Sequence, residues 1–246
     1  MEPETLLATI DQLILSDRVS FVANHNLHSA HIVQNDPAMR EFVDNADVTL
    51  IDGFPIYLLA RMAPEGVDID WRTRMRVGTL DWVSKVQTLR HLRRLAVIGS
   101  TAESNAGAVT HFRGLLPDVE ILGVPGADWD ARSASEAVEK LAEFRPNLVL
   151  VGLGMPRQEG FLQQYAAQLP PAVYATVGGA IDQLSGHQRG APRILGQYGL
   201  EWLWRLVAEP RRLAYRYLIE PWFLVRPIVG RGLPRMRSDI SGSAHG

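Results

Sequence analysis

The residues with the clearest chemical potential lie in the segment VGLGMPRQEG, residues 151 to 160. This segment continues the apolar run Leu148 to Val151, which is typical of a parallel strand covered on both faces. Gly152 and Gly154 let the backbone turn tightly, and Pro156 suits the first position of a following helix. The free N–H groups and the dipole of that helix favour an anionic ligand, such as a nucleotide diphosphate. An ordinary tight turn between strand and helix is the alternative.

A second candidate is Asp52, which directly follows the apolar stretch Val48 to Ile51 and precedes Gly53. The glycine lets a ligand approach the backbone closely. In open α/β sheets ligands bind beyond the carboxyl ends of the strands, so a carboxylate at this point is placed to act as a general base. The alternative for Asp52 is a helix cap or a turn, which is the commoner role of a strand-end aspartate.

Polar residues and glycines follow the other expected strands in the same way. They are Asn24 with His25, Ser100 with Thr101, Gly152 through Glu159, and Gly178 through Asp182. Because the carboxyl ends of parallel strands meet at one edge of a sheet, we expect these turns to contribute to a single ligand site.

The elements that must position these residues follow from the apolar pattern. Strand candidates alternate with helical patterns, which predicts a three-layer, mostly parallel α/β sheet. The expected strands lie near residues 19–23, 48–51, 95–98, 119–122, 148–151 and 173–177. The expected helices cover the first 15 residues, 27–44, a stretch after Gly53, 80–92, a stretch opened by Gly99-Ser100, 133–144 and 157–168. Ser100 and Glu103 are expected to form a capping box.

The composition is that of an ordinary globular protein, with 246 residues of which 46% are hydrophobic and 21% charged. The absence of cysteine excludes disulfides and thiolate metal sites, and it suits a reducing compartment. Acidic residues stand near the N-terminus where a secretory signal carries Lys or Arg, and no uninterrupted apolar run reaches 18 residues. We therefore expect a cytoplasmic protein without a membrane-spanning helix.

Charge is distributed unevenly along the chain. Residues 189–246, here called the basic segment, hold ten arginines against four acidic residues, a formal charge of +6, whereas the remainder carries −8. Aromatic and aliphatic side chains are interleaved with these arginines, which is typical of an interfacial helix on anionic lipid. Nucleic acid is the rival partner, but the segment has more apolar bulk than phosphate binding requires. We expect a membrane surface and no nucleic acid, with residues 1–195 as the α/β core and residues 196–246 as a helical appendage.

Four stretches together make the chain recognisable. They are the Asn24 turn followed by the pair Asp52-Gly53, then VGLGMPRQE (151–159), VGGAID (177–182) and GLEWLWRLVAEPRRLAYRYL (199–218). With these stretches the chain resembles the WecG/TagA/CpsF family of bacterial glycosyltransferases over nearly its whole length. The resemblance implies a Rossmann-type core with a C-terminal helical appendage that meets the membrane. It also implies inverting transfer of a sugar from a UDP-sugar to an undecaprenyl-diphosphate-linked acceptor.

The resemblance assigns roles to particular residues. Asp52 falls on the proposed catalytic base and Gln158 on a polar residue of the substrate pocket, while Arg205, Arg211, Arg212 and Arg216 map onto an arginine-rich region that holds the lipid diphosphate. The substrate-binding set is predicted as Asn24, Gly53, Gly152, Gly154, Pro156, Gln158, Glu159, Gly178, Gly179, Asp182, Arg205, Arg212 and Arg216. The transferred sugar is expected to be N-acetylmannosamine, its uronic acid or a related hexose, for cell-surface polysaccharide or teichoic acid. The expected location is the inner face of the plasma membrane, as a peripheral protein.

Two departures from the family pattern bear on substrate identity. Val22 stands where family members often carry Thr, so one expected sugar contact is missing. A common RAP tripeptide reads GAP here, with Gly190 in place of Arg and Arg189 one residue earlier.

The sequence evidence for a metal site or a dinucleotide site is weaker than that for a sugar-nucleotide site. Asp128 with Asp130 and Asp68 with Asp70 match a short acidic pair that holds metal in other glycosyltransferases, but such pairs arise readily by chance. His25, His28 and His31 have metal-like spacing without an acid or cysteine to complete a site, so we interpret them as helix-surface histidines. We expect no metal and no cofactor.

A nucleotide-binding α/β oxidoreductase or a regulatory module is the alternative function, although Arg157 occupies the third glycine position of the dinucleotide motif.

Overall fold

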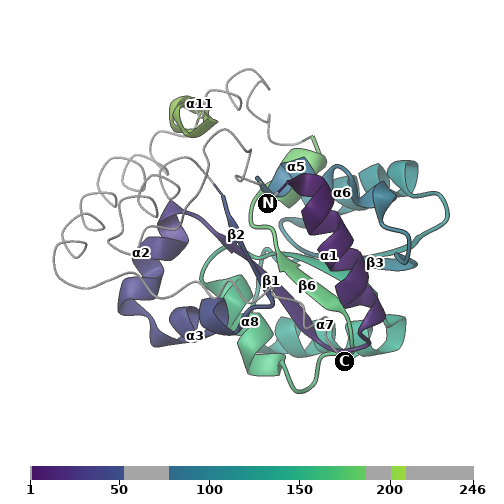
Figure 1. Cartoon of the computed structure of the whole chain (residues 1–246), viewed down its shortest axis with the longest axis horizontal. Helices are drawn as coiled ribbons and strands as arrows, with labels where there is room; N and C mark the ends of the chain where they lie inside the picture. Colours follow the sequence, from purple (N-terminus) through teal and green to yellow (C-terminus); the bar gives the residue numbers. More distant parts are fainter. Residues whose placement is uncertain (1, 53–77, 187–200, 209–246) are drawn as a thin grey trace, which may run out of the picture.

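A computed structural model describes residues 2–52, 78–186 and 201–208 of the protein (Figure 1). Within these residues, six strands form one parallel sheet in the order β2-β1-β6-β5-β3-β4. The strands are β1 (Ser20–His25), β2 (Val48–Ile51), β3 (Arg94–Gly99), β4 (Glu120–Val124), β5 (Leu148–Gly152) and β6 (Val173–Thr176). The predicted parallel α/β sheet is confirmed.

Helices cover both faces of this sheet and give the three expected layers (Figure 1). One face packs against α1 (Pro3–Leu15), α5 (Thr79–Val83), α6 (Ala102–Leu115) and α9 (Ala180–Leu184). The other face packs against α2 (Leu27–Asn35), α3 (Pro37–Asn45), α7 (Ala131–Phe144) and α8 (Arg157–Tyr165). A 3-10 turn (Val86–Thr88) follows α5, and α11 covers Glu201–Ala208. Across the described part of the chain, no helix is both long and apolar enough to span a bilayer.

The central strand β5 is apolar on both faces because both faces are covered. In β5, Leu148 and Leu150 belong to the core on the α1 and α6 side, whereas Val149 and Val151 belong to the core on the α7 and α8 side. All four side chains are fully buried. This alternation explains why the continuous apolar run of the sequence predicts a central strand.

The helix expected over residues 27–44 is in fact two helices, α2 and α3. The Asp36 side chain accepts hydrogen bonds from the backbone N–H groups of Ala38 and Met39, at 3.0 and 3.2 Å, and so caps α3. Pro37 occupies the first turn of α3 and has no N–H with which to continue α2. The prediction of one continuous helix was wrong because an Asp-Pro pair starts a helix more readily than it extends one.

The helix expected over residues 80–92 is also shorter than predicted. It is α5 followed by the 3-10 turn, after which Leu89 has extended backbone geometry. The backbone N–H of His91 donates to Asp11 Oδ1 of α1 at 3.0 Å, so a tertiary contact replaces the helical hydrogen bond.

The capping box expected at Ser100 and Glu103 is wrong. Thr101 is the N-cap of α6, and its Oγ1 accepts a hydrogen bond from the backbone N–H of Ser104 at 3.1 Å. Ser100 lies outside the helix in the left-handed region, with φ +63°, and its hydroxyl donates to Asp182 instead of capping α6.

The helix expected after Gly53 and the expected division between residues 1–195 and 196–246 lie outside the described residues.

Candidate active site

The turns that follow the parallel strands meet at one edge of the sheet, as expected. Asn24 belongs to β1, Asp52 directly follows β2, Gly152 ends β5, and Gly178 follows β6. The other described members of the predicted set are Gly154, Pro156, Gln158, Glu159, Gly179, Asp182 and Arg205, the last of them on α11. Gly53, Arg212 and Arg216 lie outside the described residues.

Asn24, Asp52 and Thr79 form a connected cluster of polar side chains at this edge. The Asn24 Nδ2 group donates to Asp52 Oδ2 at 3.1 Å and to Thr79 Oγ1 at 2.5 Å. The Thr79 hydroxyl in turn donates to Asp52 Oδ2 at 3.2 Å. Asn24 and Thr79 are buried and Asp52 is half-buried, so two buried groups hold one accessible carboxylate. Such an arrangement can accept a proton from a bound hydroxyl group.

The elements around this cluster explain its geometry. The pairing of β1 with β6 reaches Val22 and Ala175, and beyond it the backbone N–H of Asn24 donates to Thr176 Oγ1 at 2.8 Å. A side chain therefore replaces the next main-chain hydrogen bond between the two strands. On the other side of Asn24, the backbone N–H of Asp52 donates to the carbonyl of His25 at 2.9 Å, which fixes the start of the turn after β2.

Sequence reasoning missed Thr79 and Thr176. Thr176 ends a buried strand, and its position before the glycine turn is a signal that sequence inspection could have used. Thr79 has no local signal, because it lies at the start of α5, far along the chain from Asn24 and Asp52. Only the tertiary structure brings its hydroxyl to the carboxylate.

The glycine turns after β3, β5 and β6 are in close contact. A Cβ atom on Gly99 would lie 2.3 Å from the carbonyl oxygen of Gly152, and one on Gly152 would lie 2.6 Å from that of Gly178. Gly154 has φ +79°, a conformation that favours glycine, and a Cβ there would meet open space.

Pro156 is the N-cap of α8 and not its first helical residue. The predicted helix position of Pro156 is therefore wrong by one residue.

Ser100 and Asp182 join two of these turns. The Ser100 hydroxyl donates to Asp182 Oδ1, linking the turn after β3 to α9. Beneath it, Asn105 Nδ2 donates to the carbonyl oxygens of Val97 and Gly99, each at 3.0 Å. These buried hydrogen bonds hold the backbone of the turn in one conformation.

Gln158 and Glu159 are buried in this structure, with exposed fractions of 0% and 2%. Gln158 Nε2 donates to Glu159 Oε1 at 2.7 Å. Among the residues that the structure describes, Gln158 Oε1 and Glu159 Oε2 have no hydrogen-bond partner. Burial raises the pKa of Glu159 to about 7, although the hydrogen bond from Gln158 lowers it. The pair thus lies in the interior at the first turn of α8.

In the described ranges, no group of three His, Asp or Glu side chains is arranged to hold an ion, and this covers the histidines and the pair Asp128 and Asp130. Asp68 and Asp70 lie outside the described residues. His25 ends β1, lies 2.8 Å from Ser29 Oγ through Nδ1, and has a pKa lowered to about 4 by burial. Its interpretation as a helix-surface histidine is wrong, because the strand extends two residues further than expected. Asp130 caps α7, and its Oδ1 accepts from the Ser133 backbone N–H at 2.8 Å.

Val22 is 1% exposed and belongs to the core on the α1 side of the sheet. It points to the same face as Asn24 but lies two residues deeper in the strand. In this structure, the Val22 side chain packs in the core below the polar cluster.

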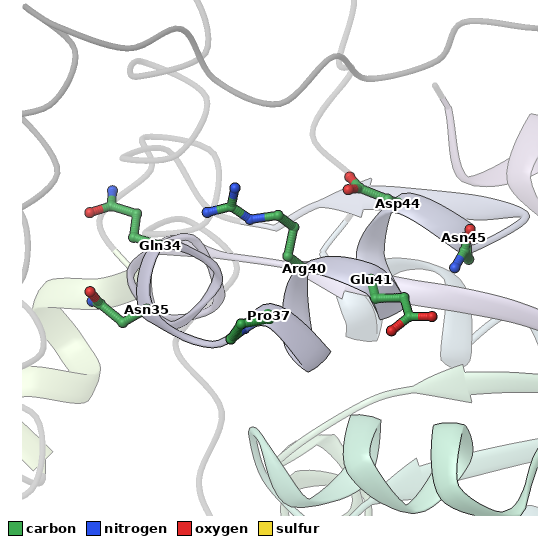
Figure 2. Close-up of a pocket in the computed structure, with 7 residues that line it drawn as sticks. All are labelled: Gln34, Asn35, Pro37, Arg40, Glu41, Asp44 and Asn45. Carbon is green, nitrogen blue, oxygen red and sulfur yellow. The ribbon is translucent and has the colours of Figure 1, made fainter.

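A hollow of about 490 Å³ lies on the outer surface of α2 and α3 (Figure 2). Its lining residues are Gln34, Asn35, Pro37, Arg40, Glu41, Asp44 and Asn45. None of the described members of the predicted site lines it, and Arg40 is already hydrogen-bonded to the Val33 carbonyl through Nη2 at 3.0 Å. This hollow is not the candidate active site.

The parallel sheet, covered on both faces, defines a Rossmann-like α/β protein, and the polar cluster beside the glycine turns is a candidate functional site at the carboxyl edge of the sheet. The model of the glycosyl transferase WecG/TagA/CpsF family matches residues 1–238. The chain therefore belongs to this family of glycosyltransferases.

Two relatives carry the same name, N-acetylglucosaminyldiphosphoundecaprenol N-acetyl-beta-D-mannosaminyltransferase. The protein from Bacillus spizizenii is 25% identical over 195 residues, covering 78% of this chain and 73% of the relative. The protein from Bacillus subtilis is 25% identical over 174 residues, covering 70% of this chain and 65% of the relative.

Proposed function

We propose that the protein transfers N-acetylmannosamine, or a related hexose, from a UDP-sugar to a polyprenyl-diphosphate-linked N-acetylglucosamine acceptor with inversion at the anomeric carbon. Family membership and the names of the two relatives support this class of sugar and acceptor. The product would enter a cell-surface polysaccharide or teichoic acid. The oxidoreductase alternative has no support in the family to which the chain belongs.

The observation that carries the proposal is the cluster in which Asn24 and Thr79 hold the Asp52 carboxylate. In the proposed reaction, the acceptor hydroxyl gives its proton to Asp52 as its oxygen bonds to the anomeric carbon of the donor sugar. The bond between that carbon and UDP breaks, and UDP leaves with the electron pair. A general base that is held in place lowers the barrier to this attack.

The departing UDP requires positive charge or N–H donors. The turn from Gly152 to Pro156 supplies backbone groups at the start of α8, and Arg205, Arg212 and Arg216 of the basic segment would supply charge. We propose that these groups replace a metal ion and that the same arginines hold the acceptor diphosphate. The protein would act at the inner face of the plasma membrane, with the basic segment on anionic lipid.

The test is transfer from a panel of UDP-sugars to a short-chain, water-soluble N-acetylglucosaminyl diphosphate lipid, with analysis of the product. We expect UDP-N-acetylmannosamine to be the best donor, and activity to persist in excess chelator. Asp52→Asn should lower kcat by about a hundredfold or more and leave the affinity for UDP unchanged. Asp44→Asn, on α3 away from the carboxyl edge, is the matched control and should be active. Near-normal turnover of Asp52→Asn removes Asp52 from the role, and a strict Mn²⁺ or Mg²⁺ requirement contradicts metal-free transfer.

A further inference from the structure

The hydrogen bonds around Asp52 distinguish its two carboxylate oxygens. Oδ2 accepts from both Asn24 Nδ2 and Thr79 Oγ1, at 3.1 and 3.2 Å. Oδ1 accepts no hydrogen bond from any of the residues that the structure describes. Among the described residues, Oδ2 therefore holds the carboxylate in place and Oδ1 has no hydrogen-bond partner.

The chemistry of the three groups fixes the direction of each hydrogen bond. The Asn24 amide nitrogen can only donate, and its two N–H groups serve Asp52 Oδ2 and Thr79 Oγ1. Because Thr79 Oγ1 accepts from Asn24, its own proton is free to serve Asp52. Rotating the Asn24 amide by 180° would place its oxygen against the carboxylate, which is unfavourable, so the amide orientation is determined by its neighbours.

Thr79 lies at the start of α5, a short helix whose apolar side chains are in the core. The side chains of Trp82 and Val83 on α5 are 1% and 0% exposed, and they anchor the helix in the core. At its N-terminus, Asp81 Oδ2 accepts from the Gly78 backbone N–H at 2.9 Å. The Thr79 hydroxyl is thus presented to Asp52 by an element anchored in the core, as an efficient site requires.

Gly78 leaves room beside Asp52 Oδ1. A Cβ atom at this position would lie 3.7 Å from Asp52 Oδ1 and 3.0 Å from Asp81 Oδ2. The backbone of Gly78, with φ −66° and ψ 149°, is compatible with any L-residue. A glycine at position 78 therefore matters because it has no Cβ atom beside Asp52 Oδ1, and not because the backbone needs a conformation that only glycine adopts.

We infer that Thr79 is a positioning residue that, with Asn24, holds Asp52 through Oδ2, so that Oδ1 is the atom that takes the proton from the acceptor hydroxyl. This inference rests on the proposed function, in which Asp52 is the base. It assigns to Thr79 a role that is exercised through the Asp52 carboxylate.

The first test compares Thr79→Val with Thr79→Ser in the full-length protein. Valine keeps the shape but removes the hydroxyl, so we expect kcat to fall by about tenfold to a hundredfold with the KM for the UDP-sugar within about twofold. Serine restores the hydroxyl and should recover kcat to within about threefold of the wild type. Equal activity of the Val variant and the wild type, or failure of Ser to rescue, overturns the inference.

A double variant separates this inference from the proposed function. If Thr79 acts only through Asp52, Asp52→Asn with Thr79→Val should be no slower than Asp52→Asn alone. Multiplied losses in the double variant contradict the inference and leave the base assignment intact. An active Asp52→Asn variant, in contrast, overturns the proposed function and this inference together.

Gly78→Ala tests the assignment of Oδ1 and keeps the side chains of Asn24 and Thr79, which donate to Oδ2. It serves also if Thr79→Val fails to fold. The added methyl group occupies space beside Oδ1, so kcat/KM for the acceptor should fall by about tenfold or more while UDP binding is unchanged. Gly160→Ala, on α8 where a Cβ meets open space, is the matched control and should be fully active. Wild-type kcat/KM for Gly78→Ala excludes Oδ1 as the proton acceptor.

Discussion

At the scale of single residues, two ionisable groups with shifted pKa values, Glu159 and His25, give the protein opposing responses to pH. The pKa of Glu159 is raised to about 7 and that of His25 is lowered to about 4, both chiefly by burial. Glu159 contributes stability that is complete below its unfolded-state pKa, near 4.5, and is lost as pH rises toward and through 7. His25 contributes stability that is complete above pH 6.5 and is lost as pH falls toward 4. The two responses partly cancel in the intact protein.

Substitution of Glu159 separates the two responses. Glu159→Gln keeps the shape but cannot ionise, so its free energy of unfolding should exceed that of the wild type by more at pH 8 than at pH 5. A pKa shift of this size corresponds to a change of about 3 kcal/mol at most. Urea unfolding of both proteins at the two pH values measures it. Glu139→Gln, at an exposed position of α7, is the control and should follow the wild type. Parallel pH dependence of Glu159→Gln and wild type contradicts the assignment.

The places of candidate site residues in the fold were predictable where the signal is local. Asp52 and Asn24 follow apolar runs, and the position at the end of a strand suffices to bring them to the carboxyl edge. Thr79 was not predictable, because its neighbours come from β1 and from the turn after β2. Gln158 and Glu159 were predicted as binding residues, but sequence position alone does not reveal that their side chains are buried and bonded to each other.

At the scale of elements, substitutions in α6 test whether Thr101, and not Ser100, caps this helix. Thr101→Ala removes the acceptor for the Ser104 N–H and should lower the free energy of unfolding by about 1 kcal/mol. Thr110→Ala, on the exposed face of the same helix, removes only a hydrogen bond to the Ala106 carbonyl and should be neutral or slightly stabilising. Chemical denaturation of the two variants makes the comparison. An equal effect of both substitutions, or none at Thr101, excludes Thr101 as the cap.

The existence of most elements was predictable, and their ends were not. Each described strand contains an apolar run, and β3, β5 and β6 are buried over most of their length. Two expected helices were too long. Asp36 and Pro37 start a new helix inside one of them, and a hydrogen bond from His91 to Asp11 ends the other. Periodicity within a helix contains no information about such tertiary contacts.

At the scale of the whole molecule, the order of the strands could not be predicted from the alternating pattern. β1 lies between β2 and β6, the first and last strands that follow it in the chain. This placement brings Asn24 next to Thr176, a pairing of residues far apart in sequence. The parallel class of sheet follows from the local pattern, but the neighbours of each strand depend on long-range packing.

The charge of the whole chain is divided between an acidic remainder and the basic segment, residues 189–246. Substituting Arg205, Arg212 and Arg216 by Ala in the full-length protein should weaken binding to anionic vesicles by roughly a hundredfold, because each arginine near such a surface contributes about 1 kcal/mol. Binding of the wild type should weaken with added salt and persist at physiological ionic strength, since apolar side chains of the segment also contribute. Vesicle sedimentation over a range of salt concentrations measures both effects.

The same triple variant decides whether the basic segment has a second role. A segment that only anchors the protein has no effect on a water-soluble short-chain acceptor, whereas arginines that hold the diphosphate are needed for that acceptor too. We expect kcat/KM on the soluble acceptor to fall by at least about tenfold, since a charge-assisted contact to phosphate contributes more than 1 kcal/mol. Ala substitution of Arg90, Arg113 and Arg132, which are exposed on the remainder of the chain, removes equal charge and is the control. Full activity of the Arg205, Arg212 and Arg216 variant on the soluble acceptor, with reduced vesicle binding, would assign the segment to membrane anchoring alone.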